Sequence, residues 1–499
     1  MKGTESQKTI LHEKGICVII PTYNNDGTVG DVIRDTLLYC DDVIVVDDGS
    51  NDNTESILSD ISNITIVRHK RNCGKGCALK SGFRKALDLG FSFAITLDAD
   101  GQHYPFFINS FVQTLIDNPG SLIVGERNLK GADRSFGSKF ANRFSDFWFY
   151  IQTGRLLKDT QTGYRLYPIK KMKGLCLLTS RYEAELELLV FSSWNGIKIC
   201  TVPIDVFYPS REERVSHFRP GVDFARISIL NFFLCILAVI YGLPMRLWRN
   251  FMIFARTSYS LLTFSFFSFT FFTPMSWLYV KMGKMTDKKK YNIHVLIYRI
   301  ARFITLTHGI PGVKFSFKKD ERVNFDKPSV IICNHQSHLD LMCQLIFTPK
   351  IIFLTNDWVW KNPFYGVLIR NADYYKVSDG IDTILPKLRN VVERGYSIAV
   401  FPEGTRSRTC KIGRFHKGAF YIAKQLGIGI TPFYLYGAGR VLKKGTYHLC
   451  KGKIHIEADP TIGQKELSAI GDLRSQASYF HKLYIKRCNE LSNKIEQDV

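Results

Sequence analysis

Two long apolar segments without charged residues lie in the middle of this 499-residue chain, and they constrain its fold more than any other feature. They cover residues 227–245 and 257–280, and each is longer than the roughly 18 residues that indicate a membrane-spanning helix. The first contains Asn231, Gly242 and Pro244 and could lie in the plane of a membrane surface. A helix of a buried core is the alternative for both. We predict a membrane-associated hairpin.

The short connector between the two segments carries Arg246, Arg249 and Arg256. Basic residues resist transfer across a membrane, so a hairpin that spans the bilayer conflicts with this connector, whereas an in-plane or re-entrant hairpin does not. The basic run KMGKMTDKKK at 281–290 follows, and it suits the anionic headgroups of lipids. Either kind of hairpin leaves both flanking regions on one side of the membrane.

Cysteine usage and the N-terminus predict which side this is. The 12 cysteines are scattered without a CxxC pair, which indicates free thiols in a reducing compartment rather than disulfides or a zinc site. The N-terminus, MKGTESQKTILHEKG, lacks the apolar core of a signal peptide. We therefore expect catalytic domains on the cytoplasmic face of a membrane, the inner membrane if the source is a bacterium.

The formal net charge of +22 predicts a polyanionic partner, namely nucleic acid, anionic lipid or phosphate-bearing substrates. The basic residues gather beside the apolar segments, and the sequence shows no recognisable nucleic-acid-binding module. A nucleic-acid-binding or scaffold protein is therefore disfavoured, and we expect a membrane partner and no nucleic acid.

Short apolar runs alternate with helical patterns on both sides of the central segments. ICVIIP, DVIVVDD, NITIVRH and FAITLDAD precede them, and SVIICNHQ, KIIFLTN, YSIAVFPEG and GIGITPFYLY follow; all are predicted to be buried strands. The alternation predicts an α/β fold with a mostly parallel sheet in each region. We place the domains at 1–225, 226–290 and 291–499.

Acidic residues end two of the N-terminal strands. Asp47 and Asp48 end the second, and Asp98 and Asp100 end the fourth. Parallel sheets bind ligands at the carboxyl ends of their strands, where two carboxylates at i and i+2 can share Mg²⁺ or Mn²⁺ and a diphosphate. A pair of solvated turn residues is the alternative. RNCGKG precedes a helix and can bring Lys75 to phosphate.

Several motifs extend this pattern to about residue 225. PTYNN, VVDDGSNDNT, NCGKGCALKSGF and LDADGQHYP occur in order, followed by DTQTGYRLY, RYEAELELL and VPIDVFYPSREERVSHFRP. Together they closely resemble the family 2 glycosyltransferases, especially the dolichol- or polyprenyl-phosphate sugar synthases. The resemblance implies a GT-A (Rossmann-like) fold, a nucleotide-sugar donor and a Mg²⁺ or Mn²⁺ cofactor. Asn24 and Asn25 depart from the commoner Asn-Glu and receive no role.

The resemblance also implies roles for individual residues. Asp47 or Asp48 would contact the nucleoside, Asp98 would lie near the ribose or diphosphate, and Asp100, with Asp98 beside it, would hold the metal. An acceptor hydroxyl would need a base, whereas an anionic lipid phosphate would need none. The candidate bases are Asp159, Glu185 and Glu187. The candidates for holding an acceptor phosphate, each of which could equally be a surface charge, are Arg165, Arg211 and Arg214.

The C-terminal region contains His335 and Asp340 in CNHQSHLD, with His338 between them. A metal site would need three or four ligands, and the sequence shows no supporting cluster; a core histidine is the other alternative. FPEGTRSR ends a predicted strand in a turn, where Gly404 lets backbone N–H groups approach an anion and Arg406 offers a rigid fork for phosphate. A candidate base and a candidate phosphate site therefore share one domain.

This combination strongly resembles the 1-acylglycerol-3-phosphate acyltransferases over roughly residues 325–440. Their H-x4-D motif and FPEGTRS motif are both present, and ITPFY supplies Pro432. Their second motif is matched more loosely, with Gly366 and Arg370. The resemblance implies an α/β glycerolipid acyltransferase domain, an acyl-CoA or acyl carrier protein donor, a lipid acceptor and no cofactor.

The implied mechanism has no covalent enzyme intermediate. His335 would remove a proton from an acceptor hydroxyl, and Asp340 would orient the imidazole. His338 is interpreted as structural. The residues expected to position the acceptor phosphate, or its equivalent, are Glu403, Gly404, Thr405, Arg406 and Arg370.

We therefore predict a bifunctional, membrane-associated enzyme that transfers a sugar to a lipid or lipid-linked acceptor and an acyl group to a lipid hydroxyl. Fusion suggests consecutive steps on one lipid. The alternative is that only one domain is catalytic and the other binds substrate or membrane.

Overall fold

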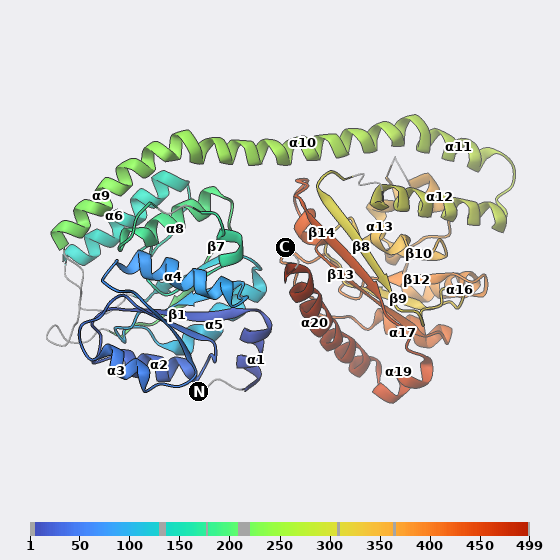
Figure 1. The fold of residues 1–499 in the computed structure, drawn as a ribbon. Helices are drawn as coiled ribbons and strands as arrows, with labels where there is room; N and C mark the ends of the chain where they lie inside the picture. The colour runs from blue at the N-terminus through green and yellow to red at the C-terminus, as the bar shows by residue number, and fades with distance from the viewer. Residues whose placement is uncertain are drawn as a thin grey trace. The chain divides into compact units, whose positions relative to one another are not determined.

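The computed structural model describes residues 5–128, 136–175, 178–207, 220–306, 310–362 and 366–497. The chain divides into two compact units, Met1–Arg249 and Asn250–Val499, each built on a seven-stranded sheet (Figure 1). The predicted α/β fold with two mostly parallel sheets is confirmed.

The first unit has the strand order β3-β2-β1-β4-β6-β5-β7. All neighbours are parallel except that β6 runs antiparallel to β4 and β5. The strands are β1 (Ile16–Thr22), β2 (Val43–Asp47), β3 (Ile64–Arg68), β4 (Phe93–Thr96), β5 (Leu122–Arg127), β6 (Arg165–Tyr167) and β7 (Ile199–Ile204). The helices are α1 (Glu5–Glu13), α2 (Val29–Leu37), α3 (Thr54–Ser59), α4 (Lys75–Asp88), η1 (Pro105–Phe107), α5 (Ile108–Asp117), α6 (Phe136–Thr153), α7 (Ile169–Met172) and α8 (Glu183–Trp194).

Strand β1 shows why this sheet needs helices on both faces. Every residue of ICVIIPT is buried. Ile16, Val18 and Ile20 belong to a core that includes residues of α2 and α5, whereas Cys17 and Ile19 belong to a second core with α4 and α8. Since successive side chains of a strand point to opposite faces, a wholly apolar strand has to be covered on both.

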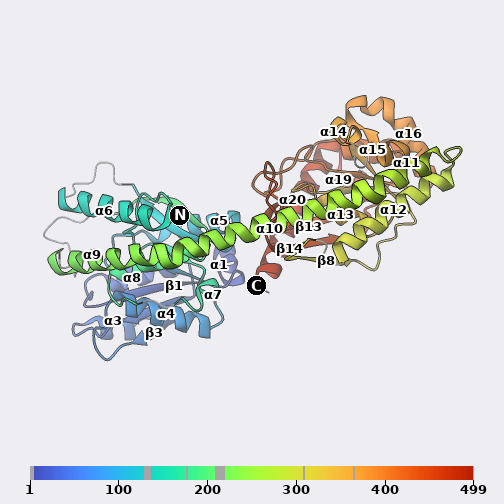
Figure 2. The same ribbon diagram turned by 90° about the horizontal axis from the view of Figure 1, so that it is seen from above.

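The predicted hairpin is wrong. The structure has one continuous helical segment from Gly221 to Lys281, and Figure 2 shows its pieces following one another without a turn. It is the one helix, within the described residues, that is long and apolar enough to cross a membrane. Its pieces are α9 (Pro220–Leu237), η2 (Ala238–Gly242), α10 (Leu243–Phe267), η3 (Ser268–Phe272) and α11 (Thr273–Lys281).

The sequence explains why this segment does not turn. The predicted connector, RLWRNFMIFAR, contains neither glycine nor proline, so nothing in it ends a helix. Pro244 and Pro274 each come two residues after a stretch of π-helix, η2 or η3. A proline lacks the N–H that an α-helix needs and its ring crowds the preceding turn, and a π-turn absorbs that defect without breaking the helix.

The second unit has the strand order β11-β10-β12-β9-β13-β14-β8, in which only the β13–β14 pair is antiparallel. The strands are β8 (Val313–Lys319), β9 (Val330–Cys333), β10 (Ile351–Thr355), β11 (Tyr375–Lys376), β12 (Ser397–Val400), β13 (Ile430–Tyr436) and β14 (Gly452–Ala458). The helices are α12 (Asp287–Leu306), α13 (Asp340–Leu345), α14 (Asp357–Trp360), α15 (Gly366–Asn371), η4 (Val377–Asp379), α16 (Ile381–Glu393), α17 (Gly418–Leu426), α18 (Ala438–Val441), α19 (Gln464–Ile470) and α20 (Leu473–Gln497).

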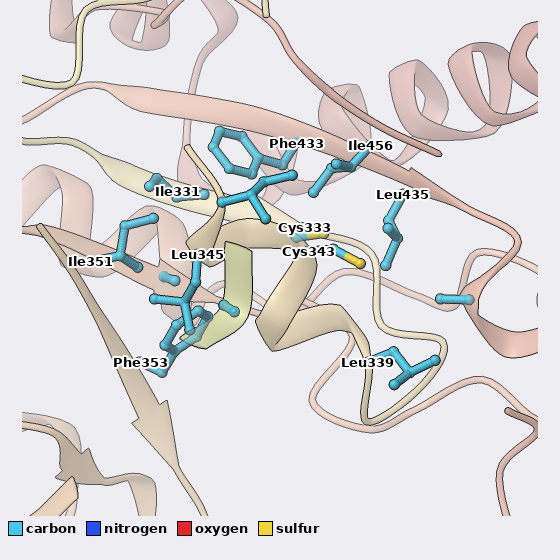
Figure 3. Close-up of a cluster of buried hydrophobic side chains, with 14 of the residues drawn as sticks. Ile331, Cys333, Leu339, Cys343, Leu345, Ile351, Phe353, Phe433, Leu435 and Ile456 are labelled. Atoms are coloured by element: carbon cyan, nitrogen blue, oxygen red, sulfur yellow. The ribbon is translucent and has the colours of Figure 1, made fainter. Parts of the chain in front are cut away.

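The core beside α13 anchors the loop that carries His335. Figure 3 shows Leu339, Cys343 and Leu345 against the side chains of the central strands, among them Ile331 and Phe433. Burial of each large apolar side chain contributes about 1.5–3 kcal/mol, so this packing holds both ends of the His335–Asp340 segment.

Candidate active sites

The first candidate site lies where β1, β2 and β4 of the first unit end. The parallel pairing of these strands brings Thr22, Asp47 and the residues after β4 to the same edge of the sheet. Asp98 and Asp100 follow β4 directly, and both side chains are partly exposed. The two acidic pairs therefore share the carboxyl edge of this sheet.

Lys75, at the start of α4, forms ion pairs with acidic residues at this edge of the sheet. Its Nζ lies 2.7 Å from Asp98 Oδ1 and 3.2 Å from Glu185 Oε2. Burial opposes the positive charge, but Asp98 and Glu185 raise the pKa of Lys75 above its ordinary value. Burial likewise opposes the charge of Asp98, and Lys75 holds the pKa of that carboxyl below its usual range. Both groups are therefore charged at neutral pH.

Gly163 in DTQTGYRLY leaves room for the Asp98 carboxylate. A Cβ atom at Gly163 would overlap the Asp98 carboxylate, because it would stand only 2.9 Å from its Cγ. Only glycine permits this approach, because real Cβ atoms do not come that close to another heavy atom. The glycine of this motif therefore leaves the space that the Asp98 side chain occupies.

Asp48 organises the loop before α4. Its carboxylate accepts hydrogen bonds from the backbone N–H groups of Cys73 (2.9 Å) and Gly74 (2.7 Å), and it lies 2.6 Å from His69 Nδ1. Asp47 accepts a hydrogen bond from the Ser50 N–H at 2.9 Å. Both aspartates thus shape this edge of the sheet.

Two groups of residues offer metal ligands. Asp48, His69 and Cys73 present ligand atoms within 4.8 Å of one another. Both ring nitrogens of His69 are already used, by Asp48 at 2.6 Å and by Ser81 Oγ at 2.8 Å, so this group is a hydrogen-bond cluster. Asp98 and Asp100 offer carboxylate oxygens at the carboxyl edge of the sheet, and Mg²⁺ and Mn²⁺ prefer such ligands.

Three residues with predicted roles in this unit are buried and bonded to other groups of the protein. Arg165 is fully buried and donates to the backbone oxygens of Thr160 and Glu185, so it cannot hold an acceptor phosphate. Asp159 is 2% exposed, and its carboxylate accepts hydrogen bonds from Nε (2.7 Å) and Nη2 (2.8 Å) of Arg127. Glu187 is buried and accepts the N–H groups of Leu178 and Thr179. Arg211 and Arg214 lie outside the described residues.

The second candidate site lies at the carboxyl end of β9. His335 Nδ1 lies 2.8 Å from Asp340 Oδ2, and Asp340 is fully buried at the start of α13. The same oxygen accepts the N–H groups of Gln336 (2.6 Å) and Ser337 (2.9 Å). Burial raises the pKa of Asp340, while His335 opposes this shift. No hydrogen bond to the other ring nitrogen, Nε2, occurs among the described residues, and the His335 side chain is 17% exposed.

The FPEGTRS segment packs against this dyad. The ring of Phe401 stacks on His335 with centroids 3.9 Å apart and planes 17° from parallel. Glu403 is 6% exposed, and its two oxygens accept the N–H groups of His335 (2.8 Å) and Gly413 (2.7 Å). Glu403 therefore fixes the backbone of His335, and both of its oxygens are already bonded to the protein.

Arg406 and Thr405 lie on the exposed side of this turn, where Gly404 adopts φ +68°. Lys444 Nζ donates to Thr405 Oγ1 at 2.9 Å and to the Arg406 carbonyl at 2.8 Å, so a second cation stands beside Arg406. Sequence reasoning missed both Lys444 and the stacking role of Phe401. Phe401 is part of the FPEGTRS motif and could have been considered from sequence. Lys444 lies almost 40 residues later, in a loop that only the fold brings close to Thr405 and Arg406.

Two further predictions have mixed outcomes. Arg370 donates to the Trp360 carbonyl at 2.6 Å, and no contact in the described part of the chain joins it to His335 or Asp340. His338 was interpreted as structural, yet it is exposed at the surface of the loop. The dyad therefore consists of His335 and Asp340, with Phe401 and Glu403 as support.

Comparison with known proteins identifies the family of the first unit. Residues 17–171 match the family model described as Glycosyl transferase family 2. The UDP-N-acetylglucosamine–dolichyl-phosphate N-acetylglucosaminyltransferase of Methanococcus voltae is 31% identical over 220 residues, which cover 40% of this chain and 88% of that protein. The chain belongs to glycosyl transferase family 2. The polyprenol monophosphomannose synthase of Mycolicibacterium smegmatis is 29% identical and is covered to 84% of its length.

The second unit matches a different family. Residues 314–436 match the model described as Acyltransferase. The chloroplastic 1-acyl-sn-glycerol-3-phosphate acyltransferase LPAT1 of Arabidopsis thaliana is 30% identical over 129 residues, which cover 24% of this chain and 35% of that protein. The chain thus spans about a third of the length of that relative. Beside the family 2 glycosyltransferase match, the chain is thus similar to acyltransferases over residues 314–436, so the resemblances predicted for the two units are both found.

Solved structures resemble each half separately. The 1-acyl-sn-glycerophosphate acyltransferase PlsC of Thermotoga maritima aligns with a TM-score of 0.42 and 20% identity over 49% of this chain and 98% of its own. Glucosyl-3-phosphoglycerate synthase of Mycobacterium tuberculosis, solved with Mn²⁺, UDP and phosphoglyceric acid, aligns with a TM-score of 0.37 and 20% identity over 48% of this chain and 83% of its own.

Proposed function

We propose that this protein is a bifunctional, membrane-associated enzyme of lipid biosynthesis. One site transfers a sugar from a nucleotide-diphospho-sugar to a lipid or lipid-linked acceptor, and the other transfers an acyl group from an acyl thioester to a lipid hydroxyl. The observation that carries the proposal is the His335–Asp340 dyad, at 2.8 Å, in a chain whose other unit is a family 2 glycosyltransferase.

The sugar transfer would take place at the carboxyl edge of the first sheet. The acceptor oxygen attacks the anomeric carbon, the bond from that carbon to the diphosphate breaks, and the nucleoside diphosphate leaves. Asp98 and Asp100 would hold a divalent cation, which supplies charge neutralisation for the diphosphate. Lys75, charged and already beside Asp98, adds a positive group at the same place. Glu185 is the remaining candidate base for a hydroxyl acceptor, while a phosphate acceptor needs none.

The acyl transfer would use His335 as a general base. Its Nε2 takes the proton of the acceptor hydroxyl, the oxygen attacks the thioester carbonyl carbon, and the C–S bond breaks as the imidazolium returns its proton to the thiolate. Asp340 holds the ring by Nδ1 and stabilises its cationic form. Arg406, with Lys444 beside its backbone, would bind a phosphate of the acceptor. This step requires no cofactor.

Membrane association rests on the helical segment Gly221–Lys281. Large apolar side chains stay exposed along it, including Leu262 (69%), Phe269 (59%) and Trp277 (51%). An apolar surface of this length suits lipid rather than water. We place both catalytic units on the cytoplasmic side.

Single substitutions test the two activities separately. Asp100→Ala should abolish turnover of nucleotide sugar and leave acyl thioester turnover intact, and His335→Ala should do the reverse. The matched controls are Asp88→Ala at the exposed end of α4 and His448→Ala on the surface of the second unit. An acyl thioester rate unchanged by His335→Ala would show that the second unit only binds substrate or membrane.

A further inference from the structure

A cavity in the first unit lies away from the sugar site. Its volume is about 360 Å³, and it is lined by the ends of α6 and α8 and by the helix from Ala238 to Arg249. Its α8 residues, Ser193 and Trp194, come just before β7, so the cavity lies toward the N-terminal end of that strand. Asp98 and Asp100 follow the opposite, carboxyl end of the sheet. The cavity is therefore separate from the sugar site.

Three arginines line this cavity, namely Arg155, Arg246 and Arg249. Arg155 Nη1 donates to the Ile197 carbonyl and Arg249 Nη1 to the Trp194 carbonyl, each at 3.2 Å. Within the described ranges no carboxylate forms an ion pair with any of the three. Burial and the charges of Arg249 and Arg246 lower the pKa of Arg155. Three neighbouring cations without an acid indicate a site for an anion.

Two glycines let the guanidinium groups approach the backbone. Gly154 (φ +66°) and Gly196 (φ +80°) lie under Arg246 and Arg249, and a Cβ atom at either would stand 2.8 Å from Nη1 of its arginine. Each guanidinium therefore lies against the backbone of the cavity wall, with Arg249 half-buried and Arg246 exposed.

Gln152 adds an uncharged polar group to the wall. It is 4% exposed, and its Nε2 donates to Asn231 Oδ1 at 2.9 Å. Its Oε1 is buried and has no hydrogen-bond partner in the described part of the chain. A buried acceptor without a donor costs free energy, and a ligand hydroxyl would remove that cost. The cavity thus matches a phosphate that is close to a hydroxyl group.

The outer wall of the cavity is apolar and faces away from the protein. Val239 and Leu243 line the cavity and are 65% and 49% exposed. Both belong to the helical segment that is apolar enough to cross a membrane. An acyl chain would find a surface directly beside the charged cavity, which a free phosphate ion would not use.

We propose that this cavity binds the headgroup of an anionic phospholipid whose phosphate diester carries a hydroxyl group, as in phosphatidylglycerol. The three arginines hold the phosphate, Gln152 Oε1 accepts the hydroxyl, and the acyl chains lie along the helix. This binding site does not depend on either proposed reaction.

Photo-cross-linking of the full-length protein tests the site. A phosphatidylglycerol with a photoreactive group near its headgroup is placed at low mole fraction in phosphatidylcholine vesicles, and labelled peptides are mapped by mass spectrometry. Labelling should fall on residues 150–155 and 238–249. Arg246→Glu should reduce it at least about tenfold, because the phosphate loses its hydrogen bond to this guanidinium and meets a negative charge in its place. Arg246 is exposed and makes no hydrogen bond among the described residues, so the fold should survive.

Arg226→Glu is the matched control, since Arg226 is exposed on the same helical segment and outside the cavity. Equal loss in both variants would assign the binding to general surface charge and overturn the proposal. Excess unlabelled phosphatidylglycerol should compete, and inorganic phosphate at the same concentration should not. Equal competition by inorganic phosphate would make this a free phosphate site, and labelling confined to other peptides would also contradict the assignment.

Discussion

At the scale of single residues, the two sites use buried carboxylates in the same way. Asp48, Asp340 and Glu403 each accept at least two backbone N–H groups of a loop that carries site residues. Hydrogen bonds of this kind to an ionised acceptor are among the strong ones, so these carboxylates fix loop geometry. Asp340 alone of the three also holds a candidate base.

Asp340→Asn should separate orientation from charge. The amide has the same size as the carboxylate, but it carries no charge to stabilise an imidazolium. If its NH2 group takes the place of Oδ2, it faces the N–H groups of Gln336 and Ser337, which are also donors. We expect acyl transfer to fall roughly 10²–10⁴-fold, the contribution that general base catalysis usually makes. Initial rates with an acyl thioester measure this effect. The control is Asp382→Asn, which changes an exposed aspartate on α16. A rate close to that of the wild type would show that Asp340 only holds the loop.

Residue-level prediction succeeded where a motif fixes a position on the fold. Asp98, Asp100 and His335 could be located from sequence because they come within four residues of the end of a short apolar run that is a strand, and Asp340 was located by its spacing from His335. Arg165 on β6 was expected at the acceptor, because no local pattern shows that this side chain is fully buried and donates to the carbonyl oxygens of Thr160 and Glu185. Burial of a charged residue depends on partners far away in the sequence.

At the scale of secondary-structure elements, the apolar helical segment shows the limit of pattern reading. Its two apolar segments predicted a membrane-associated hairpin, with a turn in the charged connector between them. Helix continuity is decided by backbone chemistry, and arginines are good helix formers whereas glycine and proline are not. The two prolines are accommodated by π-turns, which no hydrophobic pattern reveals.

The exposed apolar residues of α10 and η3 should govern membrane binding. Leu262→Glu, Phe266→Glu and Phe269→Glu together place three charges on a surface that is now 58–69% exposed and apolar. We expect the protein to leave the membrane fraction. Lys284→Gln with Lys288→Gln is the comparison, and it should weaken binding by only about 1 kcal/mol per charge and in a salt-dependent way. Membrane flotation measures both, and retention of the triple variant in the membrane would contradict the assignment.

Helix α12 carries a buried neutral histidine that should make the second unit acid-sensitive. His294 is 1% exposed between Tyr374 and Tyr396, and burial lowers its pKa from 6.5 to about 4. Below pH 6.5 the unfolded chain binds a proton that the folded chain refuses, so stability is full above that pH and is lost as the pH falls toward 4. The loss amounts to about 3 kcal/mol.

His294→Phe should flatten this dependence. Hydrogen exchange of β9 and β12, followed between pH 7 and pH 4 and corrected for intrinsic rates, reports the stability of the second unit. The variant should lose less protection in acid than the wild type, and the exposed His448→Gln should behave as the wild type does. An unchanged acid profile in His294→Phe would mean that another group sets the sensitivity.

At the scale of the whole molecule, the chain combines two compact units, each built on its own sheet. The first unit has its two cores on either face of one sheet, and the second unit has another two on its own sheet. A unit with its own core can fold without the other. If both proposed reactions occur, the fusion keeps the two activities on one chain, which matters where one unit makes what the other consumes.

Mixing two inactivated chains tests whether the reactions are consecutive. If one lipid receives both groups, Asp100→Ala and His335→Ala variants should each fail to make a species that carries a sugar and an acyl group. Co-expression of the two should restore that species, because the intermediate diffuses in the shared bilayer between intact sites. A single chain with both substitutions is the control, and mass spectrometry of extracted lipids is the measurement. Loss of two unrelated lipids, one from each variant, would show that the units act on separate acceptors and that their fusion serves a common location rather than a common product.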